Sequence, residues 1–136
     1  MRFLLDTNTL SELMKDTTSP RLLLRLAMTA PEDRATSSVT VGELLFGAHR
    51  AGVRSRELLE QARDLVANDI WVLPFDGEAA EEYAQLRAHL EARGMPIGQA
   101  DTQIAAIALA NDLTVVTANV RHFERVPGLA VENWLE

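Results

Sequence analysis

Short apolar runs alternate along the chain with longer segments in which apolar residues recur every three or four positions. The short runs predict β-strands over residues 2–5, 34–39, 69–75, 113–119 and 129–134. The longer segments predict helices over residues 9–15, 21–30, 40–52, 55–68, 77–94 and 98–112. Strands that alternate with helices indicate a parallel sheet covered by helices on both faces, so the expected fold class is α/β.

Prolines, glycines and one acid predict where several of these elements begin and end. Pro20 can open the second helix, and Pro31 stops it. Asp76 is placed to cap the fifth helix, which Gly94 ends. Pro74 interrupts the third predicted strand, because proline cannot donate to a sheet ladder. That strand is therefore expected at an edge of the sheet, or ends there.

The composition indicates one ordered domain. A chain of 136 residues, 47% of them hydrophobic, is expected to form a single compact domain over residues 1–136. The absence of cysteine excludes a disulfide framework, a thiolate zinc site and a cysteine nucleophile, and it suits a reducing cytosol. We expect no signal peptide and no membrane span, since no stretch approaches about 18 apolar residues. The expected location is the cytoplasm.

The charge balance bears on possible partners. The net charge of -7 and the pI of about 4.9 argue against non-specific binding of nucleic acid through a basic surface. An acidic protein can still act on a polyanion if its carboxylates hold cations that invert the local potential. The placement of the acids along the chain therefore matters more than their total.

Asp6 follows the first apolar strand directly. In parallel α/β folds, binding sites form outside the carboxyl ends of the strands, which favours a functional role for this acid. Aspartate is also a preferred helix N-cap, so Asp6 or Thr7 could simply begin the following helix. Taken alone, Asp6 fits both interpretations equally.

Two further acids stand out from the many expected on solvated helix faces. Glu43 lies between apolar neighbours and beside Gly42, where burying a carboxylate is costly unless it is paired or bound to metal. The alternative is a surface glutamate on the polar edge of the helix. Asp101 lies at the start of a helix, where it could also serve only to complement the helix dipole.

An amide and a histidine follow the fourth predicted strand. Asn119 would emerge on the same sheet edge as Asp6 and could hold a metal-bound water or a substrate phosphate, or it could simply form a turn. His122 comes close to the same place and is interpreted as a neutral bystander rather than a general base. His49 and His89 have no histidine partner at helical spacing and are predicted to be surface residues.

Three stretches, LLDTNTLSEL, SSVTVGELLFGA and QADTQIAAIALANDLTVVTANVRHFERVPGLAVENW, together resemble the PIN-domain ribonucleases, and specifically the VapC-type toxins of prokaryotic toxin–antitoxin modules. The resemblance covers nearly the whole chain in order. It implies a three-layer sandwich with a parallel sheet of four or five strands flanked by helices. It also implies that Asp6, Glu43 and Asp101 form an acidic triad that binds Mg²⁺ or Mn²⁺ at the carboxyl end of the sheet.

The same resemblance implies a function. It implies a metal-dependent endoribonuclease that hydrolyses RNA phosphodiester bonds, in tRNA or ribosomal RNA, and that is inhibited by a small VapB-like antitoxin. It also implies a homodimer. The alternative is a catalytically degenerate PIN-fold module that binds RNA or protein. Relatives often carry a further acid where Asn119 or His122 stands, and this sequence has neither, so the number of metal ions stays open.

Phosphodiester hydrolysis explains why such a site would be made of acids, because hard divalent cations prefer oxygen ligands. We expect Asp6 and Asp101 to be direct ligands, and Glu43 to bind metal or to orient and activate the attacking water. The residues expected to contact these ligands or the substrate phosphate are Thr7, Asn8, Thr117 and Asn119. A phosphoryl-transfer receiver domain is excluded, because its strand-end lysine has no counterpart: the only lysine, Lys15, falls in the first helix. A haloacid-dehalogenase-like phosphatase would need an aspartate where Asn8 stands.

Overall fold

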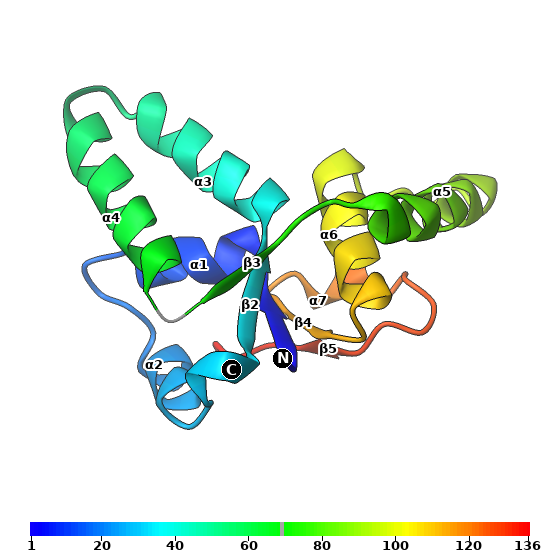
Figure 1. Cartoon of the computed structure of the whole chain (residues 1–136), viewed down its shortest axis with the longest axis horizontal. Coiled ribbons are helices and arrows are strands. Elements are labelled where there is room, and N and C mark those ends of the chain that lie inside the picture. The colour runs from blue at the N-terminus through cyan, green and yellow to red at the C-terminus, as the bar shows by residue number, and fades with distance from the viewer. Residues whose placement is uncertain (69) are drawn as a thin grey trace.

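A parallel β-sheet forms the centre of the molecule in the computed structural model of the chain, which describes residues 1–68 and 70–136 (Figure 1). Within these residues the sheet has five strands in the order β3-β2-β1-β4-β5. The strands are β1 (Phe3–Leu5), β2 (Arg34–Ser37), β3 (Trp71–Leu73), β4 (Thr114–Val116) and β5 (Val131–Glu132). Every pairing is parallel, which confirms the predicted α/β class and the upper end of the expected strand number.

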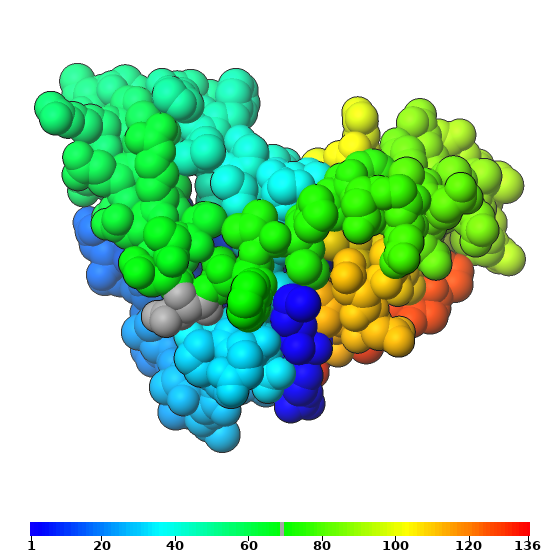
Figure 2. All heavy atoms as spheres, viewed as in Figure 1, coloured from blue at the N-terminus to red at the C-terminus, as the bar shows by residue number. Residues whose placement is uncertain are grey.

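Helices cover both faces of the sheet. They are α1 (Thr7–Leu13), α2 (Pro20–Ala27), α3 (Ser38–His49), α4 (Ser55–Ala67), α5 (Gly77–Ala92), α6 (Gln99–Ala110) and α7 (Val120–Phe123). Short 3-10 turns lie at η1 (Pro31–Asp33) and η2 (Gly52–Arg54). Helices α3 and α4 pack together as one lobe, and α5 packs on α6 as another (Figure 1). The molecular surface is notched between the two lobes (Figure 2).

The central position of β1 explains its uninterrupted apolar sequence. Leu4 pairs with Ala35 of β2 and Val115 of β4, and its side chain packs in the core beneath α5 and α6. Phe3 and Leu5 point to the opposite face and pack in the core beneath α1 and α3. Alternate residues of β1 therefore enter two different cores, and full burial of each side chain contributes about 1.5–3 kcal/mol.

The carboxyl ends of the strands meet at one edge of the sheet. Leu5 of β1 is in register with Val116 of β4, and the Asp6 N–H donates to the Val116 carbonyl at 3.0 Å. On the other side of β4, the Thr117 N–H donates to the Glu132 carbonyl at 2.9 Å. The residues that follow β1 and β4 are therefore neighbours, although they lie far apart in the sequence.

Several element boundaries differ from the predictions, and two of these differences have identifiable reasons. The strand predicted over residues 34–39 ends at Ser37, because its hydroxyl accepts the Thr40 N–H at 3.0 Å and begins α3 two residues earlier than expected. The helix predicted over residues 21–30 ends at Ala27. The Arg34 guanidinium donates hydrogen bonds to the carbonyl oxygens of Leu26 and Thr29, at 2.5 and 2.8 Å.

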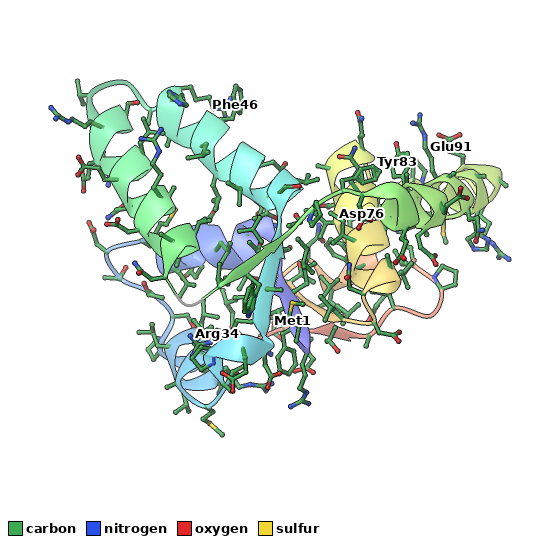
Figure 3. All side chains as sticks on the ribbon, viewed as in Figure 1. Met1, Arg34, Phe46, Asp76, Tyr83 and Glu91 are labelled. Atoms are coloured by element: carbon green, nitrogen blue, oxygen red, sulfur yellow. The ribbon has the colours of Figure 1, made fainter. Side chains whose placement is uncertain are left out.

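The predicted cap and end of α5 and the edge position of β3 are confirmed. Asp76, at the start of α5 (Figure 3), caps this helix by accepting the Ala79 N–H at 3.0 Å. Gly94 follows the helix with a φ of 65°. The strand predicted over residues 69–75 is reduced to β3, which lies at an edge of the sheet as expected. Asp69, at the start of that prediction, lies outside the described residues. Across the described chain, none of the helices combines the length and the apolar character that crossing a membrane requires.

Candidate active site at the carboxyl edge of the sheet

Asp6 is a buried carboxylate that also begins a helix. Its side chain is 3% exposed, and Oδ1 accepts the Thr9 N–H at 2.9 Å, so Asp6 is the N-cap of α1. Burial raises the pKa of Asp6, and repulsion from Asp101 adds a smaller effect in the same direction. Hydrogen bonds from Thr117 and Thr9 partly oppose this rise in pKa. The charged form of Asp6 is therefore disfavoured until a cation or further donors compensate it.

Buried hydroxyl groups fix the strand ends around Asp6. The Thr9 hydroxyl donates to the carbonyl of Val116 at 3.0 Å, and the Thr36 hydroxyl donates to the carbonyl of Leu5 at 2.8 Å. Both threonines are completely buried. Neither was predicted as part of the site, although the sequence contains a signal for them: hydroxyl residues lie at or just beyond the ends of apolar strands. These bonds hold the ends of neighbouring strands, and the start of α1, in one rigid arrangement.

Thr117 links this edge to the next loop. It is completely buried, its hydroxyl accepts the Asn119 N–H at 2.8 Å, and its hydrogen bond to Asp6 lowers the pKa of that acid. One hydroxyl can do both, because its oxygen accepts while its hydrogen donates. Thr117 therefore supports the Asp6 carboxylate and sets the path of the chain toward α7.

Asp101 reaches the same edge from α6. It lies in the first turn of that helix, as predicted, and its side chain is 29% exposed. Its repulsion of Asp6 contributes to the raised pKa of that acid, which places the two carboxylates within electrostatic reach of one another. His122, expected to be a bystander, lies with Nδ1 at 3.3 Å from Oδ2 of Asp101. The fold thus brings together β1, α6 and α7 at this point.

Glu43 does not lie in the apolar environment that its sequence neighbours suggested. Its side chain is exposed, and the residues of α3 that are buried instead are Thr40, Leu44 and Ala48. The Thr7 hydroxyl donates to Glu43 Oε1 at 2.5 Å. Because Thr7 follows Asp6 directly, Glu43 is tied to the residue next to the buried acid. It occupies the rim of the site rather than its floor.

The three predicted acids are therefore arranged as a pair with a third member at the rim. Among the residues described, no three histidine, aspartate or glutamate side chains are gathered closely enough to hold a metal ion as they stand. The donor chemistry nevertheless suits a hard divalent cation, because the groups at this edge are carboxylate, hydroxyl and amide oxygens. A cation between Asp6 and Asp101 would also relieve their mutual repulsion.

Two cavities border the site on either side of α1. The larger, of about 490 Å³, lies between α1, α3 and α4, and is lined by Thr7 and Glu43 together with Arg54. The smaller, of about 390 Å³, is lined by Asn8 and Asn119. Ser11 and Lys15 border both cavities. The predicted amide residues thus lie beside the acids, along a surface that could follow an extended ligand.

Two basic groups of this surface form ion pairs of different kinds. Lys15 pairs closely with Glu12, at 2.7 Å, and the Glu12 side chain is only 15% exposed. Arg54 approaches Glu57 at 3.6 Å, and both of these side chains are more than half exposed. An exposed ion pair of this kind contributes little to stability, so Arg54 could exchange its carboxylate partner for a phosphate group. Of the other histidines, His49 is exposed as predicted, whereas His89 is half-buried beside a cavity near α6.

Comparison with known proteins agrees with this arrangement. The family model of the PIN domain matches residues 3–129, so the chain belongs to the PIN-domain family. The chain is 34% identical over 134 residues, covering 98% of both proteins, to the tRNA(fMet)-specific endonuclease VapC of Salmonella typhimurium. It is thus a VapC-type member of the family.

Solved structures agree with the sequence comparison. The fold superimposes with a TM-score of 0.91 on a chain of the DNA-bound VapBC complex from Salmonella typhimurium, at 34% identity and over 98% of each chain. It matches VapBC-5 from Mycobacterium tuberculosis, a member of the VapBC family of toxin–antitoxin systems, with a TM-score of 0.69 at 28% identity, over 97% of this chain and 96% of that one. The match extends over the whole sheet and its covering helices.

Proposed function

We propose that the protein is a divalent-cation-dependent endoribonuclease, the toxin of a toxin–antitoxin pair, which hydrolyses phosphodiester bonds of RNA. The observation that carries this proposal is Asp6, a buried carboxylate with a raised pKa that lies beside a second acid, Asp101, at the carboxyl edge of a PIN-family sheet. A buried acid that a second acid repels is costly without a cation. The ribonuclease activity named for its VapC relative supports the same conclusion.

The roles of the residues follow from their positions. Asp6 and Asp101 would hold Mg²⁺ or Mn²⁺, which would supply a nucleophilic water at neutral pH and positive charge for the reacting phosphate. Thr117 and Thr9 keep the Asp6 carboxylate in place through the hydrogen bonds described above. Glu43, at the rim, would accept a proton from the attacking water or complete the ligand set when RNA is bound.

The substrate and partner follow from the surface and from the relatives. The cavities on either side of α1 present Asn8, Asn119 and Lys15, which would contact the phosphates and bases of the RNA next to the bond that is cut. A relative named for tRNA(fMet) supports a structured RNA such as tRNA or ribosomal RNA. The absence of cysteine fits activity in the cytoplasm.

A small VapB-like antitoxin is the partner we propose, by analogy with the VapBC complexes. It would cover apolar side chains that the structure leaves in solvent. Phe46 of α3 is 63% exposed and projects away from the core (Figure 3), and Leu24 and Met28, in and just after α2, are 59% and 74% exposed. Leu24 and Met28 are neighbours, because the Met28 N–H donates to the Leu24 carbonyl at 3.0 Å, whereas Phe46 lies far from them at the other end of the molecule (Figure 3). Neighbouring exposed apolar side chains such as Leu24 and Met28 are typical of protein-binding surfaces.

RNA cleavage by the purified protein tests the proposal. We expect the wild type to cut RNA with Mg²⁺ or Mn²⁺ and EDTA to stop the reaction. Asp6→Asn and Asp101→Asn should each lower the rate by at least about 100-fold, whereas Glu81→Gln, an exposed acid on α5, should leave it unchanged. A wild type that binds RNA without cutting it, with or without metal, would instead support the degenerate binding module.

A further inference from the structure

We propose that His122 is a positioning residue, which fixes the carboxylate of Asp101 for cation binding by donating a hydrogen bond from Nδ1. This inference rests on the proposed function, because it takes Asp101 as a cation ligand. It adds a specific residue and a specific ring nitrogen to that site.

The contact itself defines the direction of the hydrogen bond. His122 Nδ1 lies 3.3 Å from Asp101 Oδ2. An ionised carboxylate can only accept, so Nδ1 must carry the proton in this contact. Donation to one carboxylate oxygen leaves the other oxygen of Asp101 free for the cation. Metal ligands are commonly oriented by outer hydrogen bonds of this kind, which fix the geometry of the ligand.

The position of the His122 ring is set by the buried chain on either side of it. Phe123, the next residue, is completely buried in the core beneath α5 and α6. On the other side, the Thr117 hydroxyl accepts the Asn119 N–H, and the His122 N–H donates to the Asn119 carbonyl at 3.2 Å. The turn from β4 into α7 therefore holds the imidazole against α6.

The segment from Thr117 to His122 thus contacts both acids, Asp6 and Asp101. Thr117 hydrogen-bonds to Asp6, and His122 contacts Asp101 five residues further along. The His122 side chain is 37% exposed and that of Asp101 is 29% exposed, so water can partly replace a lost donor. Of the roughly 10- to 100-fold loss of metal affinity typical of such residues, we therefore expect the lower end.

Nuclear magnetic resonance of the metal-free protein tests the contact directly. The long-range ¹H–¹⁵N spectrum of the neutral ring reports which ring nitrogen carries the proton. We expect His122 to carry it on Nδ1 and to change its tautomer balance in Asp101→Asn. A ring protonated on Nε2 in the wild type would overturn the proposal without reference to any metal.

Mn²⁺ titration of variants tests the consequence. Asparagine can place its amide donor where Nδ1 stands, whereas glutamine places it nearer to Nε2. We therefore expect His122→Asn to keep Mn²⁺ affinity within about 3-fold of wild type, and His122→Gln and His122→Ala to lose about 10-fold. His49→Ala, on the exposed end of α3, is the matched control and should change nothing. Thermal melts of each variant without metal identify any general loss of structure.

The outcomes separate this inference from the proposed function. Equal Mn²⁺ affinity in all variants would refute the role of His122 and leave the metal site intact. Retention by His122→Gln with loss in His122→Asn would show a direct ligand acting through Nε2, which also overturns the proposal. Failure of the wild type itself to bind Mn²⁺ would refute the metal site, and with it the inference.

Discussion

The substitution Asp6→Asn should make the metal-free protein more stable at neutral pH while it abolishes activity. Burial raises the pKa of Asp6 in the folded state above its ordinary value of 3.8. Below pH 3.8 the proton is bound in both states, and the group costs nothing. As the pH rises through the folded-state pKa, the folded protein must ionise a buried acid, and stability is lost.

The size of the effect follows from the same linkage. Each unit by which the pKa is raised costs the folded protein about 1.4 kcal/mol at neutral pH. Asparagine removes this cost, and it keeps the cap of α1 because its Oδ1 can accept the Thr9 N–H as Asp6 does. For a domain of this size, 1 kcal/mol shifts the melting temperature by about 4 °C. The melting temperature of Asp6→Asn should therefore exceed that of wild type, by about 4 °C for each 1 kcal/mol of this cost.

Divalent metal should reverse this order. A cation that binds only the folded wild type stabilises it by about 2.7 kcal/mol at a concentration 100 times its Kd. The variant, which lacks the charge, should gain little. Thermal or urea unfolding at pH 7, with EDTA and with excess Mn²⁺, measures both differences. Well below pH 3.8, the wild type and Asp6→Asn should have the same stability in EDTA. Asp6→Ala also removes the helix cap, so its free energy of unfolding should be about 0.5–2 kcal/mol lower than that of Asp6→Asn.

One result would contradict this account of Asp6. If Asp6→Asn melts below the wild type in EDTA at pH 7, then the folded protein stabilises the Asp6 charge by itself. The hydrogen bonds of Thr117 and Thr9 would then outweigh burial, and the case for a cation would lose its main support.

Two further predictions concern the rim of the site and the core beneath it. Thr7→Val removes the hydrogen-bond donor to Glu43 but keeps the branched shape of the side chain. Single-turnover RNA cleavage should therefore slow by about 10-fold, while the free energy of unfolding in urea changes by less than about 1 kcal/mol. Undiminished cleavage would show that the contact has no catalytic role. Leu5→Ala, in the central strand and completely buried, should destabilise the protein by about 2–5 kcal/mol in urea unfolding, and a loss below 1 kcal/mol would contradict the packing of β1 between two cores.

The sequence predicted the layers of the fold because each layer has its own periodicity. The fully apolar β1 reads as a strand buried on both faces, and the acids and amides that follow β1 and β4 read as one edge of a parallel sheet. The pairing of Leu5 with Val116 joins residues far apart in the chain, and no local pattern encodes which strands become neighbours. The order of the strands in the sheet therefore cannot be predicted from the sequence pattern alone.

Two features of the site that the sequence does not reveal have a physical cause as well. Which face of α3 is buried depends on how the helix packs on the sheet after the turn at Ser37, and the buried face carries Thr40 and Leu44 rather than Glu43. The contact of His122 with Asp101 depends on a helix of only four residues, which is too short to show any periodicity. Both features are decided by single hydrogen bonds and turns, which local composition does not reveal.

The edge strand β3 also has a consequence for how the protein behaves at high concentration. Trp71 and Val72 are 58% and 40% exposed on a strand that pairs with β2. An exposed apolar edge normally invites other chains to extend the sheet, which is a route to fibrils. Here the strand is three residues long, and Pro74 follows it at once without a backbone donor. A second chain could form too few backbone hydrogen bonds with β3 to stay paired. This strand therefore limits edge-to-edge aggregation despite its apolar side chains.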